Sequence, residues 1–179
     1  MIILVGPSAS GKSVVAKYLT NELGYKKFVT STTRPIRVGE INGIDYNFLT
    51  IDTFNKKIDN NEFIEHTFYN GNFYGTEKKL VDDDTVLIVE TEGLKEFKKL
   101  NLKNVFSYFL IVDEETRIKR MEERGDDSSL ISKRVNHDHI KFKETNYENY
   151  IDKYIDCNNK TIEKIAREIS SDYKDKIIK

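Results

Sequence analysis

Short apolar runs alternate along the chain with longer segments in which apolar residues recur at helical spacing. Strands are predicted at residues 2–5, 27–30, 85–89 and 105–112. The helical segments between and after them cover residues 12–23, 93–100, 114–124, 129–143 and 161–173, with Asp113 expected as the N-cap of the third. This alternation predicts an α/β protein, a three-layer fold with a parallel central sheet buried on both faces.

The pattern changes in the middle of the chain. Residues 32–80 suggest short strands at 46–49, 63–68 and 71–74 and a helix near 52–58, with Asn70-Gly71 as a hairpin turn signal. We therefore expect a single domain whose core comprises about residues 1–31, 81–117 and 137–179, with an α+β insertion at about 32–80. The charged segment at about 118–136 is expected to form a short lid between two helices.

Composition narrows the range of partners. Lys and Arg number 29 against 30 Asp and Glu, so the formal net charge is -1 and no global field favours nucleic acid or an acidic membrane. The one cysteine, Cys157, has no internal disulfide partner and fits a reducing compartment. Neither a signal peptide nor a membrane-spanning run is visible, so we expect a cytoplasmic protein, monomer or homodimer, that binds small molecules.

The first apolar run leads directly into a glycine-rich loop. Residues 6–13 read Gly-Pro-Ser-Ala-Ser-Gly-Lys-Ser, which matches the pattern G-x-x-x-x-G-K-[ST] between a strand and a helix. Gly6 and Gly11 permit the tight turn that points successive N–H groups inward, Lys12 reaches the terminal phosphates and the Ser13 hydroxyl can bind Mg²⁺. These residues, hereafter the phosphate loop, predict a nucleoside triphosphate site.

A second set of motifs lies in the insertion. Its four parts are Thr30-Ser-Thr-Thr-Arg-Pro-Ile-Arg-Val-Gly-Glu40, Asn42-Gly-Ile-Asp-Tyr-Asn-Phe48, Asn61-Glu-Phe-Ile-Glu65 and Gly71-Asn-Phe-Tyr-Gly-Thr76. In these motifs, together with the phosphate loop, the chain resembles the guanylate kinases from residue 2 to about residue 135. The resemblance implies phosphoryl transfer from ATP, with Mg²⁺, to GMP and plausibly dGMP.

The resemblance also implies roles for individual residues. Arginine forks and tyrosine hydroxyls suit a phosphate monoester that must be held still, and carboxylates with hydroxyls suit the donors and acceptor of guanine. GMP binding is thus expected at Thr30, Arg34, Arg37, Tyr46, Glu65, Tyr74, Thr76 and Glu90. ATP binding is expected at Gly6, Pro7, Ser8, Ala9, Ser10, Gly11, Lys12, Ser13, Arg120 and Arg124. The expected catalytic residues are Lys12, Arg34, Arg124 and Arg134, and the expected metal ligand is Ser13.

The run Ile88-Val89-Glu90 departs from the family pattern, which has an aspartate at each end of this triplet. Glu90 keeps a carboxylate, whereas Ile88 replaces the residue near the Mg²⁺ shell. Two alternatives therefore stay open: a P-loop kinase of another small phosphate acceptor, such as a sugar phosphate, and a non-catalytic guanylate-kinase-like binding module. The intact Lys12 and Ser13 favour an enzyme, and the acceptor motifs favour GMP.

Overall fold

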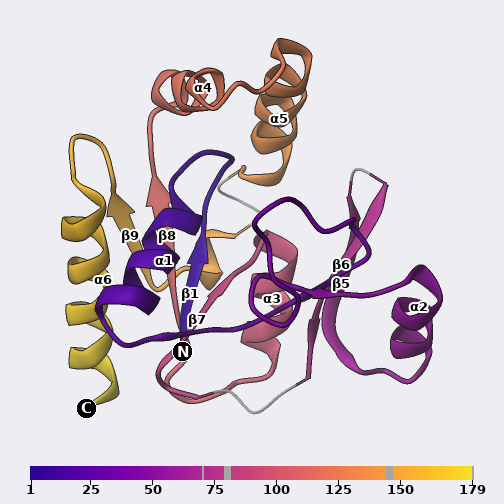
Figure 1. Ribbon diagram of the computed structural model, residues 1–179. Helices are drawn as coiled ribbons and strands as arrows, with labels where there is room; N and C mark the ends of the chain where they lie inside the picture. The colour runs from indigo at the N-terminus through magenta and orange to yellow at the C-terminus, as the bar shows by residue number, and fades with distance from the viewer. Residues whose placement is uncertain (70, 79–81, 144–146, 179) are drawn as a thin grey trace. The chain divides into compact units, whose positions relative to one another are not determined.

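The chain folds into two units, one formed by Met1–Lys26 with Asp83–Lys179 and the other by Lys27–Asp82 (Figure 1). The structure is a computed structural model, and it describes residues 1–69, 71–78, 82–143 and 147–178. Each unit has its own sheet, so each is described by itself.

The first unit is built on a five-stranded sheet of order β2-β7-β1-β8-β9. Its strands are β1 (Ile2–Val5), β2 (Lys26–Lys27), β7 (Thr85–Ile88), β8 (Phe106–Ile111) and β9 (Lys153–Asp156). β1 runs parallel to β7 and β8, and β8 runs parallel to β9. All four residues of β1 are buried, as expected for the central strand of a parallel sheet covered on both faces.

Helices follow the strands of this sheet. They are α1 (Lys12–Glu22), α3 (Thr91–Lys99), α4 (Glu114–Glu123), α5 (Ser128–Lys141) and α6 (Ile162–Ile177), with a short 3₁₀ turn at Glu148–Tyr150. Side chains cap two of them: Asp127 accepts from the Ser129 N–H at 2.8 Å, and Thr161 accepts from the Lys164 N–H at 3.3 Å. Within the described residues, no helix is both long enough and apolar enough to cross a membrane.

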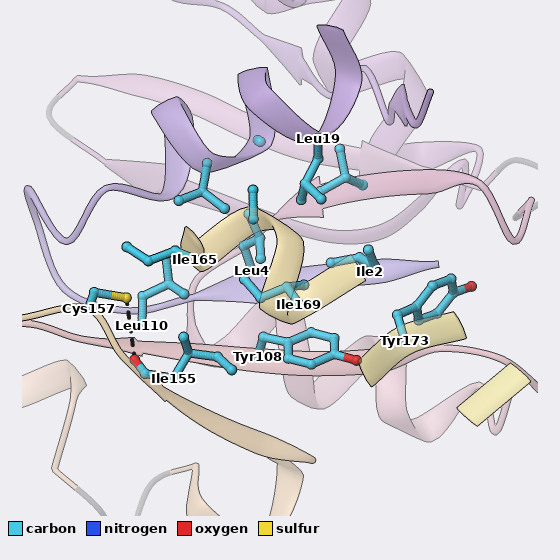
Figure 2. Close-up of a cluster of buried hydrophobic side chains, with 14 of the residues drawn as sticks. Ile2, Leu4, Leu19, Tyr108, Leu110, Ile155, Cys157, Ile165, Ile169 and Tyr173 are labelled. Carbon is cyan, nitrogen blue, oxygen red and sulfur yellow. Dashed lines mark hydrogen bonds between the residues drawn. The ribbon is translucent and has the colours of Figure 1, made fainter. Parts of the chain in front are cut away.

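The main hydrophobic core lies between the sheet and two helices. Figure 2 shows Ile2 and Leu4 of β1 together with Leu19 of α1 and Ile165 and Ile169 of α6. Figure 1 shows α1 and α6 side by side, and the two helices are in contact. Alternate strand residues point to the opposite face, where α3 packs against β1. The expected three-layer arrangement with a parallel central sheet is confirmed.

The second unit contains a four-stranded sheet of order β4-β3-β6-β5 and one helix. Its elements are β3 (Ser31–Thr32), β4 (Asn47–Phe48), α2 (Ile51–Asp59), β5 (Phe63–Tyr69) and β6 (Asn72–Glu77). Phe54 of α2 is fully buried and stacks on Phe63 and Phe73, with ring centroids 4.4 and 5.3 Å away. A Cβ on Gly75 would lie 2.9 Å from the Phe54 and Phe63 rings, so this position of β6 requires glycine.

Two details differ from the sequence-based expectation. Residues 27–30 do not form one strand, because Lys26 bonds to the Asp84 carbonyl in the first sheet, whereas the Thr30 carbonyl accepts from Asn47 beside β3 and β4. β9 was not predicted, since its sequence Lys-Tyr-Ile-Asp is short and half charged. The expected N-cap of α4, Asp113, is confirmed, and its side chain makes no capping hydrogen bond. The expected turn at Asn70-Gly71 lies partly outside the described residues, because Asn70 is not among them.

Candidate active site

The phosphate loop connects β1 to α1 at the carboxyl end of the central strand. Gly6 has φ +148°, and a Cβ there would lie 2.9 Å from the Leu110 carbonyl oxygen on the neighbouring strand. Gly11 has φ +100° and forms the N-cap of α1. Both glycines therefore occupy backbone conformations that residues with a side chain rarely adopt. The loop leads into the positive end of helix α1, an arrangement that suits an anion.

Lys12 turns its ammonium back over the loop. Its Nζ donates to the Gly6 carbonyl at 2.6 Å and to the Pro7 carbonyl at 2.8 Å. Burial lowers the pKa of Lys12 to about 8, although the carboxylates of Asp138 and Glu90 act in the opposite direction. The loop thus holds a partly desolvated cation, and a bound polyphosphate would stabilise its charged form.

A pocket of about 310 Å³ opens beside this loop, within the size range of small-molecule sites. The residues that line it come from the loop, α1, α4 and α6: Ala9, Gly11, Lys12, Ser13, Val14, Arg120, Arg124 and Ile162. Most of the residues assigned to ATP from the sequence therefore meet around one cavity. Arg120 also bonds the loop directly, since its Nη1 donates to the Ala9 carbonyl at 3.1 Å.

The two other lid arginines meet on one carboxylate. Asp126 pairs with Arg124, whose Nε donates at 3.0 Å, and also with Nη1 of Arg134. These hydrogen bonds hold the pKa of Asp126 below its usual range, with the bond from Arg124 as the main cause. Arg124 lines the pocket and Arg134 does not. Asp126 was not among the predicted site residues, although a carboxylate between lid arginines is a recognisable signal.

A second unpredicted carboxylate contacts the loop itself. Asp138 of α5 accepts from the Ser8 N–H at 2.9 Å and from the Ser8 hydroxyl at 3.1 Å. Its charge is balanced by the buried Arg117 of α4, whose Nη1 lies 2.9 Å from Asp138 Oδ2. The sequence hint was limited to spacing, since Asp138 falls one helical turn after Arg134.

In the second unit, the side-chain alternation of β6 separates two faces of the sheet. Gly75 faces α2, so Tyr74 and Thr76 share the other face. Thr76 pairs across the ladder with Glu65 of β5, and Tyr74 pairs with Thr32 of β3. We call Glu65, Tyr74 and Thr76, together with Arg34 and Tyr46, the acceptor face, because these five of the eight residues predicted to bind GMP lie there.

Arg34 and two tyrosines form one end of the acceptor face. The Arg34 guanidinium lies 5.5 Å from the centroid of Tyr46, which is in edge contact with Tyr74 at 6.3 Å. Glu40 holds Arg34 through two hydrogen bonds of 2.7 and 3.0 Å, and the bond from Arg34 lowers the pKa of Glu40. Burial raises the pKa of Tyr46, so its hydroxyl keeps the proton it would donate. Glu40 was missed from the sequence, although it ends the motif that starts at Thr30.

The remaining predicted acceptor residues differ in placement. The Thr76 hydroxyl donates to Glu65 Oε1 at 2.5 Å, which joins two of the four side chains predicted to read guanine. Arg37 is exposed, and its backbone N–H rather than its guanidinium donates to Glu40, at 2.8 Å. Thr30 contributes a carbonyl to the backbone of Asn47. Glu90 belongs to the first unit, where it is the N-cap of α3.

The fold and the loop define a class. A glycine-rich loop between a central parallel strand and a helix, with a half-buried lysine and arginines around one pocket, is the arrangement of P-loop nucleotide-binding proteins.

Comparisons with known proteins identify the family within this class. The guanylate kinase family model matches residues 1–173. The guanylate kinase of Fusobacterium nucleatum subsp. nucleatum is 32% identical over 162 residues, which cover 87% of this chain and 86% of that protein. The guanylate kinase of Chlorobaculum tepidum is 52% identical over 77 residues, which cover 42% of this chain and 40% of that protein.

A solved structure agrees with these matches. The crystal structure of guanylate kinase from Anaplasma phagocytophilum has a TM-score of 0.70 and 27% identity, and the match covers 100% of this chain and 86% of that one. The chain belongs to the guanylate kinase family.

Proposed function

We propose that the protein catalyses transfer of the γ-phosphoryl group of ATP to GMP, giving ADP and GDP, with dGMP as a second acceptor. The observation that carries the proposal is the family match over residues 1–173 in a chain whose phosphate loop keeps Lys12 and Ser13. The partly desolvated lysine over the phosphate loop favours an enzyme over a non-catalytic module, because such a module need not bind a triphosphate. The pairing of Glu65 with Thr76 favours GMP over a sugar phosphate, because a sugar phosphate has no base for these side chains to bind.

The phosphate loop and the lid arginines bind ATP in this proposal. The loop N–H groups cradle the phosphates, and Lys12 exchanges the Gly6 and Pro7 carbonyls for phosphate oxygens. Arg120 and Arg124 line the pocket and supply donors to the triphosphate. Phosphoryl transfer depends on positioning and charge stabilisation, so cations around the migrating group, Arg134 among them, are the main catalytic device.

The acceptor face binds GMP. Arg34, with Arg37, Tyr46 and Tyr74, holds the monophosphate, and Glu40 keeps the Arg34 fork in one orientation. Glu65 accepts from the N1 and N2 donors of guanine, while Thr76 fixes the carboxylate. Thr30 and Glu90 stay predicted contacts of the base. Adenine lacks these donors and would leave the carboxylate unpaired, so the site discriminates against AMP.

The protein groups at the loop fit a magnesium ion that binds together with the nucleotide. No cluster of three or more His, Cys, Asp or Glu able to hold a metal exists among the residues the structure describes, whereas Ser13 is exposed at the start of α1. Mg²⁺ is usually bound by one or two protein groups together with phosphates and waters. Ser13 would hold it, and the ion would offset negative charge on the β- and γ-phosphates. Both substrates are metabolites of the cytoplasm, where we place the reaction.

An ADP-release assay tests the proposal. Wild-type protein with MgATP is expected to turn over with GMP and much more slowly with AMP, CMP or UMP. Lys12→Ala is expected to lose turnover while still binding GMP in calorimetry, because the acceptor face lies in the other unit of the chain. Equal turnover with AMP would contradict the base assignment, and full turnover in Lys12→Ala would remove the loop from the mechanism.

A further inference from the structure

One carboxylate connects helix α5 to the phosphate loop. Only 4% of Asp138 is exposed, and both of its oxygens accept hydrogen bonds from Ser8, the third residue of the loop. The backbone N–H of Ser8 lies 2.9 Å from Oδ2, and its hydroxyl lies 3.1 Å from Oδ1. Because one carboxylate binds both the backbone and the side chain of Ser8, this corner of the loop has a single favoured conformation.

The same carboxylate connects α5 to α4. Nη1 of Arg117 lies 2.9 Å from Asp138 Oδ2 and 3.4 Å from the Ser8 carbonyl oxygen. The Arg117 side chain is 6% exposed, so the pair is withdrawn from water. Outside this pair, Arg117 Nη2 lies 3.4 Å from Glu114, which also contacts His139 at 2.5 Å. The phosphate loop and the helices α4 and α5, which include most of the predicted lid, therefore meet at one buried ion pair.

Stability alone does not account for this pair. Two charges withdrawn from water lose hydration that their mutual attraction only partly restores, and apolar residues of similar volume are often as stable or more so. Arg117 adds a further cost, because its Nε is buried without a hydrogen-bond partner among the described residues. What an apolar pair would not provide is an acceptor for Ser8. The ion pair therefore differs from an apolar pair in the two hydrogen bonds that Asp138 accepts from Ser8, and not in the free energy of unfolding.

Arg117 and Asp138 lie on the same two helices, α4 and α5, as the arginines of the predicted lid. Arg134 lies four residues before Asp138 on α5. Arg120 of α4 and Arg124, the C-cap of that helix, lie three and seven residues after Arg117. Residues at these spacings share a helix face. The ion pair thus connects α4 and α5 on the helix faces that bear these arginines.

We propose that Asp138 is a positioning residue, which holds Ser8 and the phosphate loop in the shape that binds ATP, and that Arg117 is its buried counter-ion. Neither residue contacts substrate in this role. Loss of the acceptor at residue 138 is expected to raise the KM for ATP and to lower kcat, with the KM for GMP unchanged. This inference rests on the proposed function for its kinetic readout but not for its binding readout.

The test separates two roles of Asp138: accepting a hydrogen bond from Ser8 and carrying the negative charge that pairs with Arg117. In an Arg117→Leu background, Asp138→Asn keeps an acceptor for the Ser8 N–H, and Asp138→Ala removes it, while neither double variant buries a charge at this pair. Binding of the ATP analogue AMP-PNP is measured by calorimetry, and amide exchange is measured in the peptide of residues 5–12. We expect the Asn variant to bind within about threefold of wild type, and the Ala variant about tenfold more weakly with faster exchange.

A matched control is available in the same unit. Asp152 accepts from the Ser107 N–H and hydroxyl, each at 2.7 Å, and pairs with Lys98. It therefore reproduces the chemistry of Asp138 away from the loop, and Asp152→Ala is expected to lower stability without changing the affinity for AMP-PNP. If Asp138→Ala does not fold in the Leu background, Asp138→Ser, which is too short to reach Ser8, takes its place with the same expected result.

The outcomes are distinct. Equal AMP-PNP affinity and equal loop exchange in the Asn and Ala variants would overturn the positioning role. An equal loss in Asp152→Ala would also overturn it, because the effect would then be general destabilisation. Failure of wild type to phosphorylate GMP would instead reject the proposed function, and the AMP-PNP and exchange comparison would still decide the role of the pair.

Discussion

Replacing Lys12 by Met should change how the stability of the ligand-free protein depends on pH. Burial lowers the pKa of Lys12 from 10.5 to about 8, so the folded state binds this proton less tightly than the unfolded chain does. Between these two values the unfolded chain holds a proton that the folded protein has released. The free energy of unfolding of the wild type therefore rises with pH in this window.

The magnitude follows from the size of the shift. Each pKa unit corresponds to about 1.4 kcal/mol, so the lowering of the Lys12 pKa from 10.5 to about 8 costs the folded state about 3 kcal/mol at neutral pH. About 2.5 kcal/mol of this cost should be relieved between pH 7 and pH 10. Lys12→Met has no ammonium to bury and should lack this contribution, so that its advantage over wild type is largest at pH 7.

Urea unfolding of both proteins at pH 7, 8, 9 and 10, without nucleotide, measures the difference. Other titrating groups contribute equally to both proteins and cancel in the comparison. Lys17→Met, which removes an exposed lysine from the same helix, controls for net charge. A difference between wild type and Lys12→Met that stays constant from pH 7 to pH 10 would refute the description of Lys12 as a desolvated cation over the loop carbonyls.

Three further substitutions test the assigned roles. Arg34→Ala should raise the KM for GMP by about tenfold or more and leave the KM for ATP nearly unchanged, because it removes the guanidinium held by Glu40; equal changes in both constants would count against it. Glu65→Gln should reduce the ratio of GMP to AMP turnover, since a carboxamide presents donors as well as an acceptor to the base; an unaltered ratio would exclude Glu65 from base reading. Arg124→Ala should lower kcat by about a hundredfold or more in rapid-mixing experiments, and wild-type kcat would remove Arg124 from the transition state.

Much of the fold was accessible from the sequence because apolar periodicity is a local signal. β1 and α1 were predicted to within a residue at each end, since a fully buried strand and a helix that starts after Gly11 each have distinct patterns. β9 was missed, because its buried residue Ile155 stands among charged neighbours and the strand is identified only by pairing with β8. Strand pairing over long sequence separations leaves little trace in a short, charged segment.

The candidate site likewise has parts that the sequence predicts and parts that it does not. The phosphate loop and each acceptor motif are continuous stretches of sequence: the loop was identified from its pattern of residues, and the acceptor motifs from their resemblance to the guanylate kinases. Glu40, Asp126 and Asp138 were missed because each acts by orienting another group: two hold arginines, and the third holds the backbone of Ser8. Such supporting contacts depend on side-chain directions across elements, which spacing does not specify.

Label transfer from [γ-³²P]ATP tests the central claim most directly. Wild-type protein is incubated with Mg²⁺, labelled ATP and an equimolar mixture of GMP, AMP, CMP, UMP and glucose 6-phosphate, and the labelled products are separated and identified. The account predicts that nearly all transferred label appears in GDP. Label in ADP from AMP, in another nucleoside diphosphate or in a sugar bisphosphate at a level equal to that in GDP would contradict it, as would no transfer at all.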